Sequence, residues 1–82
     1  MMVEEIDRGL VKKIKKRIDD VIKKNKDEFK SAEDLNQAKK IASQLVKASD
    51  PSEMINQVAD IANLVKDSKK LSKEFENILD MI

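Results

Sequence analysis

Apolar side chains recur every three or four residues along most of the chain, and this spacing limits the fold more than any other feature. In the first segment they fall on one side of a helix that turns about 100° per residue. A helix with one apolar stripe is stable only when that stripe is buried against another element. The stripe keeps its phase to Phe29 and so predicts a helix over residues 3–29: Val3, Ile6, Leu10, Val11, Ile14, Ile18, Val21, Ile22 and Phe29.

A second helix is predicted over residues 32–48. Ser31 followed three residues later by Asp34 has the spacing of a capping box, in which the serine side chain accepts a hydrogen bond from the start of the helix. The residues that follow form one apolar stripe, with alanines small enough to let a neighbouring helix come close. The stripe consists of Leu35, Ala38, Ile41, Ala42, Leu45 and Val46.

The strongest capping signal starts a third helix after Asp50. Asp50 is a favourable cap, Pro51 suits the first helical position, and Glu53 can reach back to the backbone before the helix. The turn between residues 48 and 51 is short. We therefore expect the second and third helices to form an antiparallel hairpin.

The apolar stripe changes direction near Ser68, and two structures explain this change. Either the chain breaks there and a fourth helix folds back, or one helix continues over residues 51–81 with a stripe that drifts as a heptad repeat does. We favour the continuous helix, because Lys69 and Lys70 are unfavourable at the positive end of a new helix and no Gly or Pro interrupts the segment. Such a helix would extend about 20 Å beyond its partner.

The predicted fold is thus all-α, an up-down bundle of three long helices (3–29, 32–48 and 51–81) with coiled-coil-like packing, or alternatively of four helices with a break near Ser68. We expect residues 1–82 to form one domain, since no linker or repeat divides them.

The chain of 82 residues contains no His, Cys, Trp or Tyr. Without Cys there is no thiolate ligand or disulfide, and without His there is no Glu-x-x-His pair of the kind that holds two metals in a bundle. Acid–base catalysis by the remaining Ser, Asp, Glu and Lys needs a concave pocket that shifts their pKa values. A bundle this small has little room for one, so we expect no enzyme activity and no catalytic, cofactor-binding or metal-binding residues.

Seventeen basic and sixteen acidic residues leave a net charge of +1. The N-terminus is acidic and no unbroken apolar run follows it, so we expect neither a signal peptide nor a membrane span, and a soluble, cytoplasmic protein. Basic residues concentrate in the predicted first helix, which makes weak binding of an anion or a nucleic acid one hypothesis. The lack of Trp and Tyr and the interspersed acidic residues argue against nucleic acid.

The regular patterning, the caps at Ser31 and Asp50 and the scarcity of aromatic residues resemble computationally designed helical bundles. Gly9, Asn25 and Ser68 depart from an idealised design; they suit a bundle assembled from native-like helical fragments, and equally an ordinary natural protein. The resemblance implies a structural scaffold without a specific biochemical activity, which is our first functional hypothesis.

The alternative hypothesis is a protein–protein interaction module. A continuous third helix would expose its C-terminal apolar face unless another chain covered it, and a homodimer through that helix would do so. The predicted interaction face consists of Leu71, Phe75, Ile78, Leu79 and Ile82.

Overall fold

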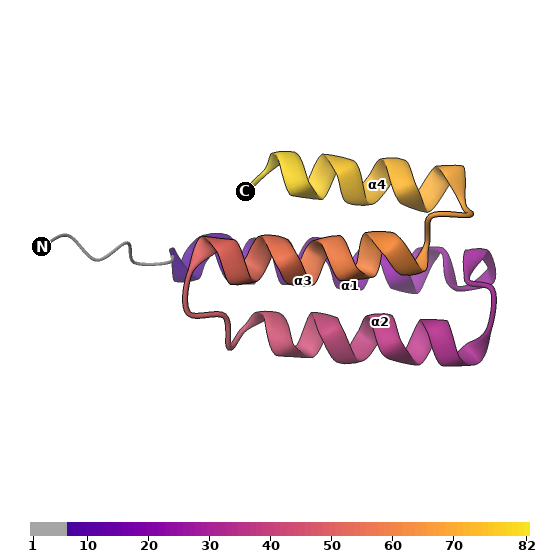
Figure 1. Cartoon of the computed structure of the whole chain (residues 1–82), viewed down its shortest axis with the longest axis horizontal. Coiled ribbons are helices and arrows are strands. Elements are labelled where there is room, and N and C mark those ends of the chain that lie inside the picture. The colour runs from indigo at the N-terminus through magenta and orange to yellow at the C-terminus, as the bar shows by residue number, and fades with distance from the viewer. Residues whose placement is uncertain (1–6) are drawn as a thin grey trace, which may run out of the picture.

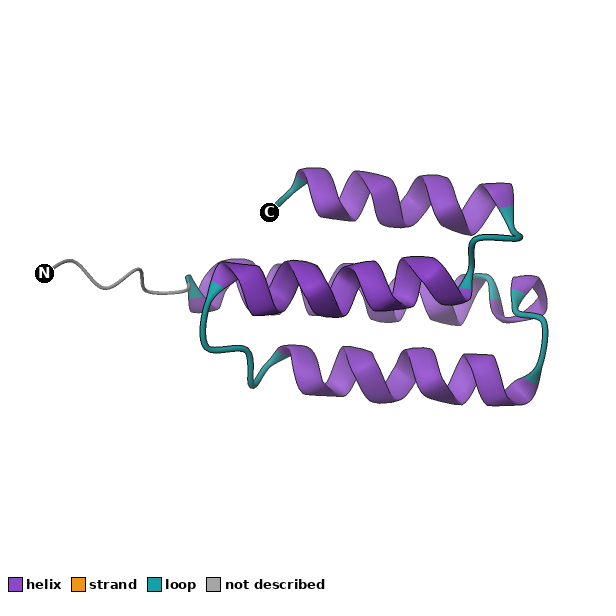
Figure 2. Ribbon diagram, viewed as in Figure 1, coloured by secondary structure: helices purple, strands orange, loops and turns teal. Residues whose placement is uncertain are grey.

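The computed structural model describes residues 7–82, which are mostly α-helical (Figures 1 and 2). The predicted all-α class is confirmed, and no strand occurs among these residues. The elements in chain order are α1 (Arg8–Lys24), the single 3-10 turn η1 (Lys26–Glu28), α2 (Ala32–Leu45), α3 (Pro51–Leu64) and α4 (Lys69–Asp80).

The four α-helices form a closed ring. α2 packs between α1 and α3, and α4 packs on α3 and returns to α1. In Figure 1, α1 lies behind α3, with α2 below them and α4 above. Successive helices run in opposite directions, as expected of an up-down bundle. Because the helices follow this order around the ring, the side formed by α1 and α2 lies opposite the side formed by α3 and α4.

The predicted continuous helix over residues 51–81 is wrong, and the break near Ser68 is present. Ser68 has an extended backbone, and its Oγ accepts a hydrogen bond from the Leu71 amide at 3.2 Å. The break turns the apolar stripe of α4 onto the core. Burying one leucine or phenylalanine side chain contributes about 1.5–3 kcal/mol. An unfavourable lysine in the first turn costs at most about 1 kcal/mol, so burial outweighs the positions of Lys69 and Lys70.

The predicted helix over residues 3–29 is too long. Asp7 caps α1 by accepting hydrogen bonds from the Gly9 and Leu10 amides, and the expected positions of Val3 and Ile6 lie outside the described residues. α1 ends at Lys24 and is capped by Asn25, whose backbone amide and Nδ2 both donate to the Val21 carbonyl, at 3.1 and 2.9 Å. Phe29 follows η1 and reaches the core from outside the helix.

The caps predicted for α2 and α3 are confirmed. Ser31 Oγ accepts from the Asp34 amide at 3.2 Å, and Asp50 Oδ1 accepts from the Glu53 amide at 2.8 Å. Glu53 also reaches back, since its Oε2 accepts from the Ser49 amide at 2.9 Å. α2 ends earlier than predicted, at Leu45 instead of residue 48.

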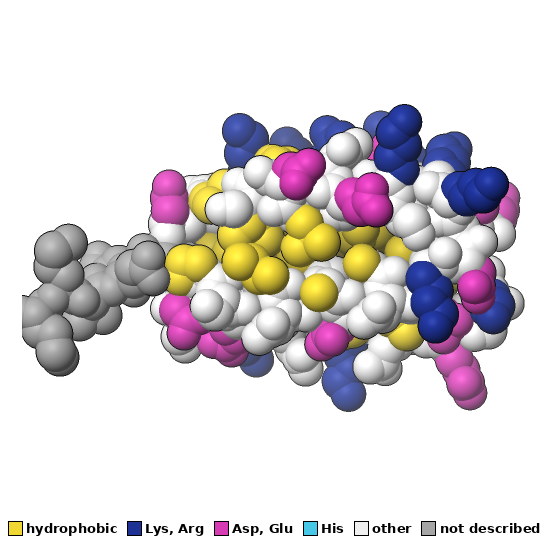
Figure 3. Space-filling model, turned by 45° about the horizontal axis from the view of Figure 1, so that its top comes forward, with side chains coloured by type: hydrophobic (Ala, Val, Ile, Leu, Met, Phe, Trp, Pro, Cys, Tyr) yellow, Lys and Arg dark blue, Asp and Glu magenta, His cyan; other side chains and the backbone are white. Residues whose placement is uncertain are grey.

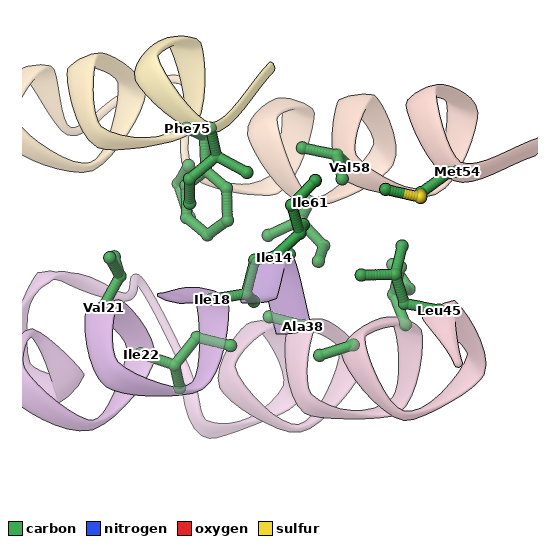
Figure 4. Packing of buried hydrophobic residues seen from close by; sticks show 14 of the residues in the cluster. Ile14, Ile18, Val21, Ile22, Ala38, Leu45, Met54, Val58, Ile61 and Phe75 are labelled. Carbon is green, nitrogen blue, oxygen red and sulfur yellow. The ribbon is translucent and has the colours of Figure 1, made fainter. Parts of the chain in front are cut away.

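Within residues 7–82, seventeen buried apolar side chains from all four helices and two connections form one core. In Figure 4, Phe75 of α4 points into the bundle toward Ile18 of α1 and Ile61 of α3. All three side chains are completely buried. α4 is therefore an integral part of the bundle.

Candidate interaction site

The predicted interaction face divides between the core and the surface. Leu71, Phe75 and Ile78 are 0% exposed. Leu79 and Ile82 are half-buried at the edge of the core. Because α4 folds back, the exposed extension from which we inferred a homodimer is absent, and the first three residues are not available to a partner of the folded chain.

The outward flanks of the helices can be assigned from one hydrogen bond. On a helix, the residues directly before and directly after a buried position lie on opposite flanks. Ser72 follows the buried Leu71, and its Oγ donates to the Val65 carbonyl at the end of α3, at 3.2 Å. This flank of α4 therefore faces α3. Antiparallel neighbours present corresponding flanks to each other, so α3 presents to α4 the residues that follow its own buried positions.

These two flanks form a largely apolar surface, which we call the α3–α4 face. Figure 3 looks onto it and shows hydrophobic side chains in a strip along the middle, with both acidic and basic side chains above and below. Ile55 is 41% exposed, one of two exposed large apolar side chains within residues 7–82. The face consists of Ile55, Ala59 and Ala62 of α3 and Ser72, Glu76 and Leu79 of α4.

Of the α3–α4 face, the sequence prediction contained only Leu79. Ile55 lies beside the buried stripe of α3 and is followed by Ala59 and Ala62 at helical spacing. This row of apolar residues next to the core stripe is the signal that identifies the face. The row indicates an exposed surface only when the arrangement of the helices is known, because a neighbouring helix could otherwise cover it.

The opposite side of the ring, which we call the α1–α2 face, is basic. It contains a groove of about 410 Å³ with Ile22 among its lining residues and lysines around it. Val46, predicted in the buried stripe, is 41% exposed, because it follows the last buried residue of α2 and lies on this flank. The face consists of Lys12, Lys15, Lys16, Asp19, Lys23 and Lys26 with Lys39, Ser43 and Val46 of α2.

The predicted basic surface of α1 is divided between two sides of the helix. Lys12 and Lys23 lie toward α2, whereas Lys24 lines a separate cleft of about 340 Å³ between α1 and α4. That cleft also contains the carboxylates of Asp20 and Glu74, and Arg17 lies 3.9 Å from Glu74. Its mixed charge favours no anion, so the basic character is concentrated on the α1–α2 face.

The two halves of the chain differ in charge. Residues 8–48 carry thirteen basic and six acidic side chains, and residues 49–82 carry four basic and seven acidic ones. Since α1 and α2 lie opposite α3 and α4, opposite sides of the bundle have opposite net charge. Such an arrangement orients charged partners as they approach.

An ion pair joins the two connections at one end of the bundle. Lys30 Nζ lies 2.6 Å from Asp67 Oδ2, and both side chains are exposed. The hydrogen bond and the charge of Lys30 lower the pKa of the Asp67 carboxyl, and Asp67 in turn raises the pKa of Lys30. Nearby, Ser68 Oγ donates to Glu28 at 3.2 Å.

Replacing Asp67 with asparagine is expected to remove a pH-dependent contribution to stability. The lowered pKa of Asp67 means that the contribution is present above the unfolded-state pKa and is lost as the pH falls through the folded-state pKa. The pKa of Lys30 is raised, so the contribution of the ion pair to stability is also lost when Lys30 is deprotonated in strong alkali. Melting temperatures of wild type and Asp67→Asn should differ slightly at neutral pH and converge at acidic pH. Asp60→Asn is the control, because Asp60 has no ion-pair partner within residues 7–82; equal pH profiles for both variants would contradict the assignment.

No group of three or more acidic side chains within the described part of the chain is placed to hold a metal ion. None of the helices in residues 7–82 combines the length and the apolar character needed to cross a bilayer. Comparison of the chain with protein-family models, with curated proteins and with solved structures gives no match.

Proposed function

We propose that this chain is a non-enzymatic helical module that binds a helical partner through the α3–α4 face. The observation that carries the proposal is the position of Ile55. A single exposed isoleucine is ordinary on a protein surface, but Ile55 continues into the half-buried Ala59, Ala62 and Leu79 on one side of the bundle. Small side chains between larger ones leave room for the side chains of a helix that lies along the face.

The charges around the face indicate the chemistry of the partner. Glu76 and Asp80 lie one turn apart on α4, and both are exposed. The third and fourth helices together carry an acidic excess. A helix with an apolar stripe flanked by lysine or arginine would match both the apolar strip and these carboxylates.

A nuclear magnetic resonance titration tests this proposal. The probe is a synthetic amphipathic peptide with leucines on one helical face and lysines on its flanks. We expect the methyl signals of Ile55, Ala62 and Leu79 to shift, while that of Leu64 stays unchanged, because Leu64 precedes a buried residue and lies on the other flank of α3. Ile55→Lys should abolish the shifts and Gln37→Lys should preserve them. Failure of the α3–α4 methyl signals to shift in the wild type would refute the proposal.

A structural scaffold without binding activity is the second candidate, and it is the role implied by the resemblance to designed bundles. The observation that favours it is the placement of the apolar residues, most of which lie in one core shared by four capped helices. A scaffold should unfold cooperatively, and no ligand should raise its melting temperature beyond the effect of ionic strength. Stabilisation by the leucine and lysine peptide would favour the interaction module instead.

A further inference from the structure

The two exposed large apolar side chains among residues 7–82 lie on opposite sides of the bundle. Val46 belongs to the α1–α2 face and Ile55 to the α3–α4 face, and each is 41% exposed. Both are close to the connection between α2 and α3, Val46 directly after α2 and Ile55 in the second turn of α3. They therefore lie at the same end of the molecule.

Opposite charges are placed at this same end. Glu76 and Asp80 lie in the second half of α4, which runs toward it. Lys12 and Lys16 lie in the first half of α1, which starts there (Figure 1). All four side chains are exposed. The carboxylates flank the α3–α4 face, and the lysines belong to the α1–α2 face.

The order of the helices in the ring makes these features complementary between two copies of the chain. When a second copy is placed in the same orientation against the α3–α4 face, its α2 lies over α3 and its α1 lies over α4. Val46 of the second copy then lies over Ile55. Its first-helix lysines lie over the carboxylates of α4. A translation of the second copy, without rotation, matches both the two apolar side chains and the opposite charges.

We propose that the chain associates head to tail with further copies of itself, the α3–α4 face of one copy binding the α1–α2 face of the next. This inference rests on the proposed function and identifies the partner as a second copy. The contact joins two different surfaces. An assembly of any length therefore still has one free α3–α4 face at one end and one free α1–α2 face at the other, and association does not stop at a dimer. Lys66 precedes α4, and Lys69, Lys70 and Lys73 lie in its first half, where they repel the lysines of the second copy. The electrostatic attraction is therefore concentrated at the end with Ile55.

Light scattering after size-exclusion chromatography tests the association. The average mass of the wild type should rise above the 9.4 kDa monomer with concentration and should not level off at twice that value. The rise should be steep at about 0.01 M salt and weak at about 1 M, because the Debye length falls from about 30 Å to about 3 Å. A wild type that stays monomeric at millimolar concentration in low salt would overturn the proposal.

Two variants, each with one face disabled, test the head-to-tail geometry. In the first, the α3–α4 face loses its exposed isoleucine and its carboxylates; in the second, the α1–α2 face loses its exposed valine and two lysines. Neutral polar residues are introduced in both, so that the two disabled faces do not attract each other. The first variant combines Ile55→Gln, Glu76→Gln and Asp80→Asn, and the second combines Lys12→Gln, Lys16→Gln and Val46→Gln.

Each variant alone should be monomeric, and an equimolar mixture should form a complex of two chains, because one intact junction remains between them. Circular dichroism of each variant verifies that it is folded. A second variant that still dimerises alone would show an isologous contact through the α3–α4 face and would overturn the head-to-tail arrangement.

Lys13→Gln with Lys40→Gln is the matched control, since it removes two charges outside the α1–α2 face and should leave association unchanged. If the leucine and lysine peptide binds while the wild type stays monomeric, the proposed function stands and this inference fails.

Discussion

Replacing Phe75 with alanine is expected to lower the free energy of unfolding by about 3–5 kcal/mol, the usual cost of removing a large buried aromatic side chain. Phe75 is completely buried and lies between α4 and the facing helices (Figure 4). A domain of this size has a total stability of about 4–12 kcal/mol. The substitution should therefore remove at least about a quarter of the total stability.

Urea titration monitored by circular dichroism measures this loss. Phe29→Ala is the matched control, because it is the same substitution at the only other phenylalanine, which is half-buried and outside the helices. We expect the Phe75 variant to lose at least twice as much stability as the Phe29 variant. Equal losses would mean that α4 is not packed into the core.

Replacing Asn25 with aspartate is expected to cost about 1–4 kcal/mol. The Asn25 side chain is 9% exposed, and its Nδ2 donates to the Val21 carbonyl at the end of α1. A carboxylate cannot donate this hydrogen bond. The Val21 carbonyl keeps the backbone amide of residue 25 as a donor at 3.1 Å, but the new carboxylate would be buried without a donor, which costs about 1–3 kcal/mol. Its negative charge would also lie at the negative end of the helix dipole, which adds about 0.3–1 kcal/mol.

Thermal melting of Asn25→Asp and Asn36→Asp at neutral pH checks this prediction. Asn36 is exposed in the first half of α2, so the same substitution there should change the melting temperature little. Asn25→Leu gives a further comparison, because it removes the hydrogen bond without introducing a charge and should cost less than Asn25→Asp. A melting temperature of Asn25→Asp close to that of Asn36→Asp would show that the side chain does not close the end of α1.

Local signals predicted the helix starts well and the breaks poorly. The caps at Ser31 and Asp50 depend on neighbouring residues alone, and the structure contains both. The break at Ser68 depends on tertiary packing. The local residues favour a continuous helix, and the apolar stripe of α4 is buried only when α4 contacts the other helices. A serine cap is worth about 1 kcal/mol, whereas the stripe gains several times as much by reaching the core.

Phe29 illustrates a second limit of periodicity. Its spacing from Ile22 fits a continuous helix, yet the chain leaves the helix at Asn25 and still brings Phe29 to the core through η1. Two backbone paths thus bury the same side chain. Only the polar asparagine, which can close a helix with its own side chain, distinguishes them in the sequence.

The candidate site was less predictable than the fold. The stripe from Leu71 to Ile78 has the composition of an interaction face, but its use depends on whether α4 folds back. Ile55 and Val46 each follow a buried residue by one position, and the order of the helices in the ring determines where those flanks lie. Sequence periodicity separates buried from exposed positions, but it does not show which neighbouring helix each flank of a helix faces.

The fold-back of α4 onto α1 within one chain is the central claim, because both faces depend on the closed ring. An isotope-filtered nuclear Overhauser experiment on a mixture of labelled and unlabelled chains tests it most directly. We expect contacts between the Phe75 ring and the Ile18 methyl groups within a single chain, unchanged on dilution. The same contacts appearing between labelled and unlabelled chains would show a continuous helix shared between two copies and would contradict the account.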